Sequence, residues 1–443
     1  MQRTVKAFHL KTTKHIKKKL LYWSDNYDVA LWLDSNNYQQ HYSSFDAILA
    51  LEECTAIETD YINAFEKLKK YQSIIQDYIF GYLSYDVKND VEKLTSGNFD
   101  GLGFDDLFFF QPKKMIVLKG NKIAFHYLKM VADEIEEDFK TIKNTAIEYI
   151  ATTSSNGSDI NEKNDFTIKP RIHKKEYLQK VAKILEHIHR GDIYESNFCQ
   201  EFYIENYEIK PTRVYLDLND ISEPPFATYL KKYDHYLVSA SPERYLKKEG
   251  TKIISQPIKG TARRMVNTID DKRAAADLYN DEKERAENIM IVDLVRNDLS
   301  RTAKKGSVIV EELCKTYSFK QVHQLISTVT SQISQDIHPV DVIKDSFPMG
   351  SMTGAPKISA MKIIEKLEET KRGLYSGAVG YFTPENNFDF NVVIRSILYN
   401  ASNKYTSFSV GSAITSKSTP EKEYEECLLK GKAMELVLTG YSK

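Results

Sequence analysis

Cysteine is scarce in this sequence, and charge of one sign is not in excess. The four cysteines are far apart and form no Cys-x-x-Cys pair; they are Cys54, Cys199, Cys314 and Cys427. A disulfide framework or a cysteine-bound zinc site is therefore not expected, and a reducing compartment fits. The 61 basic and 62 acidic side chains leave a net charge of −1, which gives no indication of a nucleic acid or an anionic membrane as a partner.

Long hydrophobic runs are also missing. No run approaches the ~20 apolar residues that a membrane-spanning helix needs. The N-terminal segment is basic, but Asp25 and Asp28 interrupt the stretch that follows it, so this region is a poor signal peptide. We expect a basic arm in solvent and a cytoplasmic protein without a membrane partner.

The chain does contain the material for a large core. Of its 443 residues 42% are hydrophobic, and its 28 tyrosines and 21 phenylalanines argue against disorder. This length allows one large domain or two to three smaller ones. Residues 1–150 indicate a mixed α/β region, residues 151–165 are polar without periodicity and predict a linker or a mobile loop, and residues 166–443 form a further region.

Hydrophobic periodicity predicts helices and strands along the whole chain. The predicted helices cover residues 131–150, 174–190, 281–299 and 420–438. The predicted strands cover residues 29–33, 114–118, 122–127, 306–313, 319–333, 377–382, 388–399 and 405–410. Many strands of antiparallel type with helices between them indicate an α+β fold rather than a doubly wound parallel sheet.

Residues 256–263 combine several features of a reactive site. They follow a predicted hairpin with arms at 244–246 and 252–254, and Pro257, which cannot donate to a ladder, should end the second arm. Gly260 lets the backbone approach a ligand, and Thr261 offers a hydroxyl. Lys259 becomes a nucleophile if desolvation or neighbouring cations favour its neutral amine. On these residues alone, a surface lysine after a hairpin is the better interpretation.

Four motifs in a fixed order change that interpretation: residues 241–245, 257–261, 284–299 and 354–357. Together they resemble the motifs of the chorismate-utilising enzymes, a family that includes anthranilate, isochorismate, salicylate and aminodeoxychorismate synthases. The resemblance extends from Ile172 to Leu438. It implies two large, mainly antiparallel sheets packed face to face, with helices outside and the active site between the sheets. Residues 1–150 would contribute to the same sandwich.

Two positions indicate a branch of that family. Lys259 is similar to the lysine of the branch that forms 4-amino-4-deoxychorismate, whereas enzymes that make anthranilate or isochorismate usually carry alanine there. Isochorismate synthases place a water-activating lysine close to residues 192–198, but no lysine occurs here between Lys183 and Lys210. Glu195 stands in that segment, where relatives more often have glutamine. The resemblance therefore implies amination of chorismate at C4, on the route to p-aminobenzoate and folate.

Two alternatives to this activity stay open. One is an anthranilate-forming or another chorismate-converting enzyme, and the other is a non-catalytic sensor of chorismate or an amino acid that kept the fold. Glutamine-dependent relatives receive ammonia from a class I glutaminase with a Gly-x-Cys-x-Gly site, and none of the four cysteines has that setting. We therefore expect the glutaminase to be a separate subunit.

The resemblance gives the catalytic roles to Lys259 and Glu243. Lys259 would attack C2 of the chorismate ring and expel the C4 hydroxyl, which Glu243 would help to leave. Ammonia would then attack C4 and expel the lysine. The plain alternative for Glu243 is a strand-end glutamate paired with Arg244. Because the pKa of an ordinary lysine is ~10.4, we expect burial or a nearby Mg²⁺ to shift Lys259 toward the free amine.

Two Glu-x-x-Glu pairs on separate predicted helices are the candidate Mg²⁺ ligands. They are Glu284 with Glu287 and Glu423 with Glu426. Mg²⁺ takes oxygen ligands and is usually held by one or two carboxylates together with water and substrate. The resemblance implies direct coordination by Glu287 and Glu426, with Glu284 and Glu423 holding coordinated water. Each pair taken singly is also typical of an exposed helix.

The resemblance also implies a set of substrate contacts. They are Gly260, Thr261, His323, Thr353, Gly354, Tyr375, Arg395, Gly411, Ser412, Ala413 and Lys430. Arg395 is expected on a strand with residues 392–394, where its guanidinium can grip a carboxylate. Relatives usually have glycine in place of Ala413. His323 alone is more often a core histidine, and Lys430 is nearly as often a solvent-facing lysine.

Overall fold

The computed structural model describes residues 2–12, 15–36, 38, 42, 45–146, 166–320 and 322–440. The predicted linker at 151–165 and the end of the predicted helix at 131–150 lie outside the described residues. Ladders join the described strands into one hydrogen-bonded array of 20 strands. Every ladder is antiparallel, from the long pairing of β3 (Ala47–Thr59) with β5 (Leu107–Lys119) to the pairing of β8 (Glu195–Ile204) with β20 (Tyr405–Thr415). The predicted α+β fold is thereby confirmed.

The array consists of two sheets that share β3 and β5. The first sheet runs from β8 through β20, β19 (Ser396–Asn400), β10 (His235–Ser241), β9 (Phe226–Lys232), β2 (Val29–Asp34), β3, β5 and β6 (Lys122–Leu128) to β1 (Arg3–His9). The short strands β7 (Lys169–Pro170) and β16 (Gly354–Ala355) also pair with β8.

The second sheet begins at the other end of β5. It continues through β4 (Ile79–Leu83), β17 (Ala378–Phe382), β18 (Phe388–Val392), β11 (Arg244–Glu249) and β12 (Lys252–Gln256) to β15 (Val322–Gln332), which also pairs with β13 (Ile258–Arg263) and β14 (Ile309–Ser318).

An irregularity in β3 and β5 lies where the two sheets meet. Along its edge away from β3, β5 pairs first with β4 and then with β6. The register between β3 and β5 shifts between Glu53 and Thr55, opposite Pro112, and Glu52 has a φ of 58°. Proline cannot donate to a ladder, and a bulge bends its strand. The two long strands can therefore turn from one sheet into the other.

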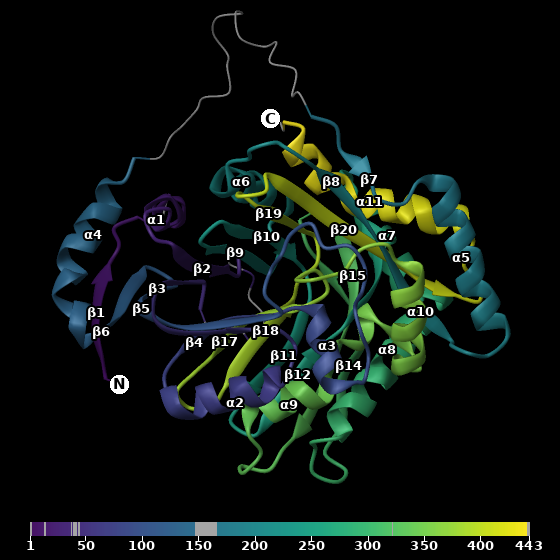
Figure 1. The fold of residues 1–443 in the computed structure, drawn as a ribbon, viewed down its shortest axis with the longest axis horizontal. Coiled ribbons are helices and arrows are strands. Elements are labelled where there is room, and N and C mark those ends of the chain that lie inside the picture. The colour runs from purple at the N-terminus through teal and green to yellow at the C-terminus, as the bar shows by residue number, and fades with distance from the viewer. Residues whose placement is uncertain are drawn as a thin grey trace, which may run out of the picture.

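Alternate side chains of the strands enter two different cores. In β2, Leu31 belongs to a core that also contains Phe80 of β4 and Val379 of β17, so this core lies between the sheets. The neighbouring Trp32 belongs to a second core that the first sheet forms with helices. Helices therefore cover the outer face of the first sheet, as Figure 1 shows.

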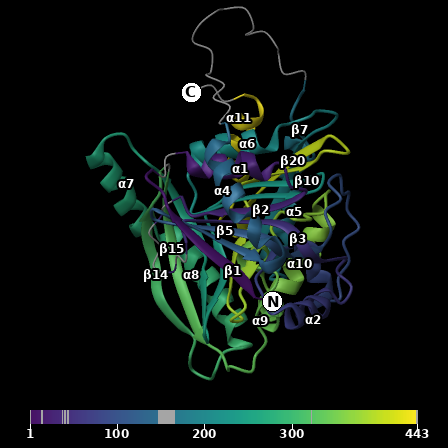
Figure 2. The same ribbon diagram turned by 90° about the vertical axis from the view of Figure 1, so that its left-hand side faces the viewer.

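The second core includes residues from α1 (Ile16–Ser24), α4 (Ile135–Asn144), α5 (Lys174–His189), α6 (Pro211–Ser222), α10 (Lys357–Leu367) and α11 (Pro420–Leu438). α2 (Ala64–Ile75), α8 (Glu282–Ser300) and α9 (Pro339–Ser346) contribute to the first core. Figure 2 shows α7 (Thr268–Asn280) and α8 beside the β14–β15 pair. The shorter helical segments are α3 (Lys88–Val91), η1 (Tyr85–Val87), η2 (Lys129–Glu134) and η3 (Gly350–Met352). No described helix is long and apolar enough to cross a membrane.

One strand prediction is wrong in a way that matters for the site. Residues 388–399 form two strands rather than one: β18 pairs with β17 and β11 in the second sheet, and β19 pairs with β10 and β20 in the first. The chain changes sheets at residues 393–395, where Arg395 has a φ of 53°. Apolar residues on both sides hid this break, because both strands are buried. α7 was also not predicted.

A buried arginine forms hydrogen bonds with several segments that are far apart in the sequence. Arg372, which is 5% exposed, donates to both carboxylate oxygens of Glu368 at 2.9 and 2.6 Å, to the Met352 carbonyl at 2.5 Å and to the Asn197 carbonyl at 2.7 Å. Glu368 also accepts the backbone N–H of Cys199 at 2.8 Å. This cluster connects β8, η3 and the end of α10.

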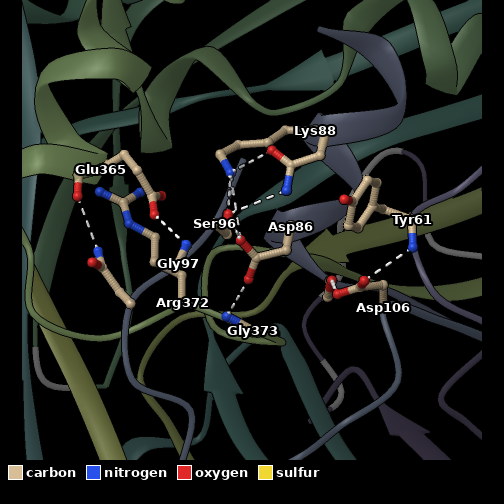
Figure 3. Close-up of polar contacts among 12 residues, drawn as sticks. Tyr61, Asp86, Lys88, Ser96, Gly97, Asp106, Glu365, Arg372 and Gly373 are labelled. Carbon is tan, nitrogen blue, oxygen red and sulfur yellow. Dashed lines mark hydrogen bonds and ion pairs between the residues drawn. The ribbon is translucent and has the colours of Figure 1, made fainter. Parts of the chain in front are cut away.

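The segment around α3 supports the same cluster. Figure 3 shows Asp86 between Ser96 and Gly373: its carboxylate accepts from the Ser96 hydroxyl at 2.5 Å and from the Gly373 N–H at 3.0 Å. Lys88 also donates to Ser96, at 2.7 Å. Because Gly373 follows Arg372, these bonds restrain the arginine from the side of the N-terminal region.

Replacing Arg372 by methionine should destabilise the fold strongly. Arg372→Met leaves the buried Glu368 charge without its partner, which should lower the free energy of unfolding by about 3–5 kcal/mol. Urea unfolding followed by circular dichroism measures this change. Arg296→Met is the control, because Arg296 is 52% exposed in its ion pair with Asp293 and should change stability by less than about 1 kcal/mol. Equal effects of the two substitutions would contradict the role given to Arg372.

Candidate active site

A bulge in β13 places Lys259. Ile258 pairs with Ile326 and Thr261 pairs with Gln324, so Lys259 and Gly260 together oppose one residue of β15. Gly260 has a φ of 92°, a left-handed conformation that glycine adopts without steric cost. Pro257 ends β12, as predicted, and the chain continues into β13 along the same β15. A bulge of this kind re-aims side chains, and here it directs Lys259 away from regular pairing.

Lys259 lies among carboxylates from several elements. Its Nζ is 3.4 Å from Oε1 of Glu195 on β8, and the side chain of Lys259 is 17% exposed. Burial lowers the pKa of Lys259, but the negative charges of Glu195, Glu287 and Glu426 outweigh burial and hold its pKa above the ordinary value. We expected burial to lower the pKa of Lys259 and so favour its neutral amine. With only the protein's own side chains present this expectation is wrong, because the carboxylates stabilise the ammonium form.

Glu243 is a buried carboxyl group close to Lys259. Its Oε1 accepts a hydrogen bond from the Ser351 hydroxyl at 2.8 Å. Burial raises the pKa of Glu243 to about 7, even though Ser351 and Lys259 act in the opposite direction. Arg244 pairs with Asp389 instead, at 2.9 Å, so the plain alternative of a Glu243–Arg244 pair is wrong. At neutral pH such a group exchanges protons readily.

Two of the predicted metal-binding glutamates, Glu287 and Glu426, lie close enough to Lys259 to raise its pKa, and Glu284 lies beside Gly260. α8 begins after Asp281, whose side chain accepts the Glu284 N–H at 2.9 Å, and it presents Glu284 and Glu287 one turn apart. Oε2 of Glu284 lies 3.2 Å from the point where a Cβ on Gly260 would stand. Burial and repulsion by Glu287 raise the pKa of Glu284. Burial also raises the pKa of Glu287, which Lys259 and Lys283 offset only in part.

α11 supplies the second glutamate pair. Glu426 is 2.6 Å from Lys430 Nζ, and this contact together with Lys259 outweighs the effect of burial, so the pKa of Glu426 is lowered. Glu423 is buried on the same helix. Among the described residues no group of three or more His, Cys, Asp or Glu side chains is close enough to enclose a metal ion. The donors are nevertheless of the type that Mg²⁺ prefers, and Mg²⁺ commonly completes its coordination with water and substrate.

The guanidinium group of Arg395 has no hydrogen-bond or ion-pair partner among the described residues. Its main-chain carbonyl accepts the Ala240 N–H at 3.0 Å. Burial lowers the pKa of Arg395, and only Tyr375 and Glu426 act against this. A partly buried cation without a counter-ion indicates a site for an anion that the protein itself does not supply.

The loop before α10 lies against the same strand as Glu195. Gly354 has a φ of 146°, and a Cβ there would stand 2.1 Å from the Glu195 carbonyl oxygen, so only glycine permits this approach. The Thr353 hydroxyl bonds within its own loop, to the carbonyls of Met349 and Gly350 at 3.2 Å. Pro356 is the residue that precedes α10.

β20 brings the predicted Gly411–Ala413 segment beside β8. Gly411 pairs with Cys199 and Ala413 with Asn197, and Lys430 donates to the Gly411 carbonyl at 2.9 Å. The Ser412 side chain points the other way, toward the helices, where its hydroxyl is 3.4 Å from that of Tyr177. Only the backbone of Ser412 is therefore available on the side of the site. On that side, the Tyr375 hydroxyl contacts Cys199 Sγ at 3.7 Å.

Among the described residues, no hydrogen bond or ion pair connects the predicted substrate contacts His323 and Thr261 to Lys259. The ring nitrogens of His323 are engaged by the Ser318 hydroxyl at 2.8 Å and by Asp271 on α7 at 3.0 Å. This arrangement is that of a satisfied core histidine. Thr261 is exposed on β13. Both positions stay predictions as substrate contacts.

Sequence reasoning missed residues that hold the reactive groups. Ser351 holds Glu243, and Asn197 in turn donates to the Ser351 carbonyl at 2.9 Å. Glu195 was noted only as a departure from glutamine, although it is the group that contacts Lys259. The residues of each contact are far apart in the sequence. The glutamate at position 195 in place of glutamine was therefore the only local signal.

Replacing Glu195 by glutamine should lower the pKa of Lys259. Glu195→Gln removes the negative charge nearest to the ammonium group, so the free amine should form at lower pH than in the wild type. The measurement is the pH dependence of Lys259 acetylation by acetic anhydride, read by peptide mapping. Glu201→Gln is the matched control, because Glu201 lies on the same strand but pairs with Arg171. An unchanged or upward-shifted profile in Glu195→Gln would exclude this electrostatic role.

Comparisons with known proteins agree with this geometry. A family model described as chorismate binding enzyme matches residues 28–435. Anthranilate synthase component 1 of Aquifex aeolicus is 32% identical over 364 residues, which cover 80% of this chain and 73% of that protein. Aminodeoxychorismate synthase component 1 of Escherichia coli is 38% identical over 266 residues, which cover 59% of this chain and 58% of that protein.

A solved structure shows the same architecture. The crystal structure of anthranilate synthase component I from Streptococcus pneumoniae superposes with a TM-score of 0.73 at 25% identity and covers 90% of this chain and 94% of that one. The matched range contains the positions of Lys259, Glu195, Glu287, Glu426 and Arg395. The chain belongs to the chorismate-binding family of chorismate-converting enzymes.

Proposed function

We propose that this chain is component I of an aminodeoxychorismate synthase, which converts chorismate and ammonia to 4-amino-4-deoxychorismate for p-aminobenzoate and folate biosynthesis. The observation that carries the proposal is Lys259, held by the bulge 3.4 Å from Glu195 and close to a Glu243 whose pKa is raised to about 7. This arrangement supports a nucleophilic role for Lys259 and an acid role for Glu243.

Lys259 would act as the nucleophile toward the ring. Its neutral amine forms a bond to C2, both ring double bonds shift toward C4, and the C4–O bond breaks. Glu243, partly protonated near neutral pH, gives its proton to the departing hydroxyl, which leaves as water. Ammonia then bonds to C4 as the C2–N bond breaks, and the Glu243 carboxylate takes the proton that the new amine loses. The enolpyruvyl ether stays in place throughout.

The charged groups around Lys259 would hold the substrate. Chorismate is a dicarboxylate, and Arg395 offers a guanidinium that the described protein leaves without a partner. Glu287 and Glu426 would bind Mg²⁺, and Glu284 and Glu423 would hold its water. The ion supplies positive charge for a substrate carboxylate. It would also relieve the repulsion that contributes to the raised pKa of Glu284.

Ammonia would come from a separate class I glutaminase subunit in the cytoplasm. No cysteine of this chain lies in a Gly-x-Cys-x-Gly setting, which supports a second polypeptide.

Anthranilate synthase component I is the second candidate function, because the similarity to the Aquifex aeolicus protein covers 80% of this chain. That reaction aminates C2 and loses pyruvate, so the products distinguish the candidates.

The test is product analysis with defined nitrogen donors. With chorismate, Mg²⁺ and ammonium, the purified chain should form 4-amino-4-deoxychorismate, and p-aminobenzoate should appear only after a lyase is added. With glutamine it should be silent until a class I glutaminase is supplied. Lys259→Ala should lose most of this product, with a fall of at least about 100-fold, because covalent catalysis is lost. Anthranilate as the wild-type product would refute the proposal.

The metal assignment predicts a graded response to substitution. Glu284→Gln, which would act through water, should weaken Mg²⁺ binding by about 10- to 100-fold, and Glu287→Gln should weaken it more because a ligand charge is lost. Calorimetric titration of Mg²⁺ with chorismate present and ammonia absent measures binding without turnover. Glu425→Gln, an exposed residue of α11, is the control. Identical Mg²⁺ isotherms for wild type and Glu287→Gln would show that Glu287 is not a ligand.

A further inference from the structure

Asn288 connects the nucleophile strand to the carboxylate helix. It lies on α8 immediately after Glu287 and is 1% exposed. Its Nδ2 donates to the main-chain carbonyl of Lys259 at 3.2 Å and to that of Leu325 at 3.1 Å. One side-chain amide therefore bonds to the two opposed segments of the β13 bulge.

The orientation of this amide is fixed by the partners of its oxygen, which are the Ser327 hydroxyl and, at 3.6 Å, the Cys314 thiol. The Ser327 hydroxyl donates to Asn288 Oδ1 at 2.5 Å, and the Ser327 oxygen in turn accepts the backbone N–H of Cys314 at 2.9 Å. Turning the amide over would place its oxygen against the carbonyl oxygens of Lys259 and Leu325, which cannot donate to it. The network permits a single arrangement, in which each polar atom of Asn288 has a partner.

The bulge creates the need for such a partner. Ladder pairing stops at Ile258 and resumes at Thr261, so the register assigns Lys259 no paired residue on β15. A buried carbonyl without a donor is unfavourable. Because Asn288 satisfies it from α8, the backbone of Lys259 and the helix that carries Glu284 and Glu287 are held at one separation.

We propose that Asn288 is a positioning residue that holds Lys259 in register with the carboxylates of α8. The proposal rests on the proposed function, in which Lys259 attacks a substrate held partly through those carboxylates. A displacement of about 1 Å between reacting groups costs about 100-fold in rate. The amide touches neither substrate nor ion; it acts through the main chain of Lys259.

The test compares Asn288→Ala with Asn297→Ala. Asn297 is exposed on the same helix, so its replacement changes helix composition in the same way without touching β13. Asn288→Ala should lower kcat about 10- to 100-fold per folded molecule, with a smaller change in KM for chorismate. Without Mg²⁺ or substrate, acetic anhydride should label Lys259 at least 3-fold faster than in the wild type, relative to the exposed Lys140. Asn297→Ala should match the wild type in both measurements.

A second variant keeps the proposal testable if Asn288→Ala does not fold. Ser327→Ala leaves Asn288 in place but removes the hydroxyl that orients it, so kcat should fall by a smaller factor and Lys259 labelling should again rise. A folded Asn288→Ala or Ser327→Ala protein with wild-type kcat and wild-type labelling overturns the proposal, even when its melting temperature is lower.

Failure of the proposed function gives a different result. If the wild type releases anthranilate or isochorismate, the proposed function fails, yet the ratio of variant to wild-type kcat for that product and the labelling of Lys259 still decide the role of Asn288. If aminodeoxychorismate forms at equal rates in wild type and Asn288→Ala, the function stands and the positioning role is refuted.

Discussion

Charge compensation around one partly buried lysine is the constraint on which the site depends. Lys259 on β13 lies close to Glu195 of β8, Glu287 of α8 and Glu426 of α11. Charges removed from water are costly unless opposite charge and hydrogen bonds replace the solvent. The ammonium form of Lys259 meets part of this need, and Lys430 meets another part at Glu426. A divalent cation and a dianionic substrate have the charges that match the remaining carboxylates and Arg395.

Two irregular segments of the strands position these groups. The bulge at Lys259 and Gly260 takes the lysine out of strand pairing, and residues 393–395 carry the chain from one sheet to the other. A regular strand would continue along its own sheet with side chains alternating between faces. The interruptions instead aim side chains into the space between the sheets, and buried hydrogen bonds from Asn288 and Arg372 hold the irregular segments.

Membership of the chorismate-converting family does not by itself decide the product. Proteins named anthranilate synthase and aminodeoxychorismate synthase are 32% and 38% identical to this chain, and the antiparallel sheets would suit either reaction. The product depends on which group attacks the ring and at which carbon, and in the proposed reaction that group is Lys259. Glu195 bears on this role, because its carboxylate faces Lys259 and stabilises the ammonium form.

The sequence by itself determined the α+β class, the four helices that correspond to α4, α5, α8 and α11, the hairpin before Pro257, the family, and the residues that carry charge at the site. These features depend on local periodicity, on turn residues and on side-chain chemistry, which are properties of neighbouring residues. Only the tertiary structure decided that residues 388–399 divide between two sheets, that Ser412 faces the helices, that Asp271 engages His323, and that Glu195 and Asn288 meet Lys259. Each of these depends on contacts between segments far apart in the chain. The physical reason is that burial and electrostatic environment are set by such contacts, whereas hydrophobic patterning reports only which face of an element turns inward.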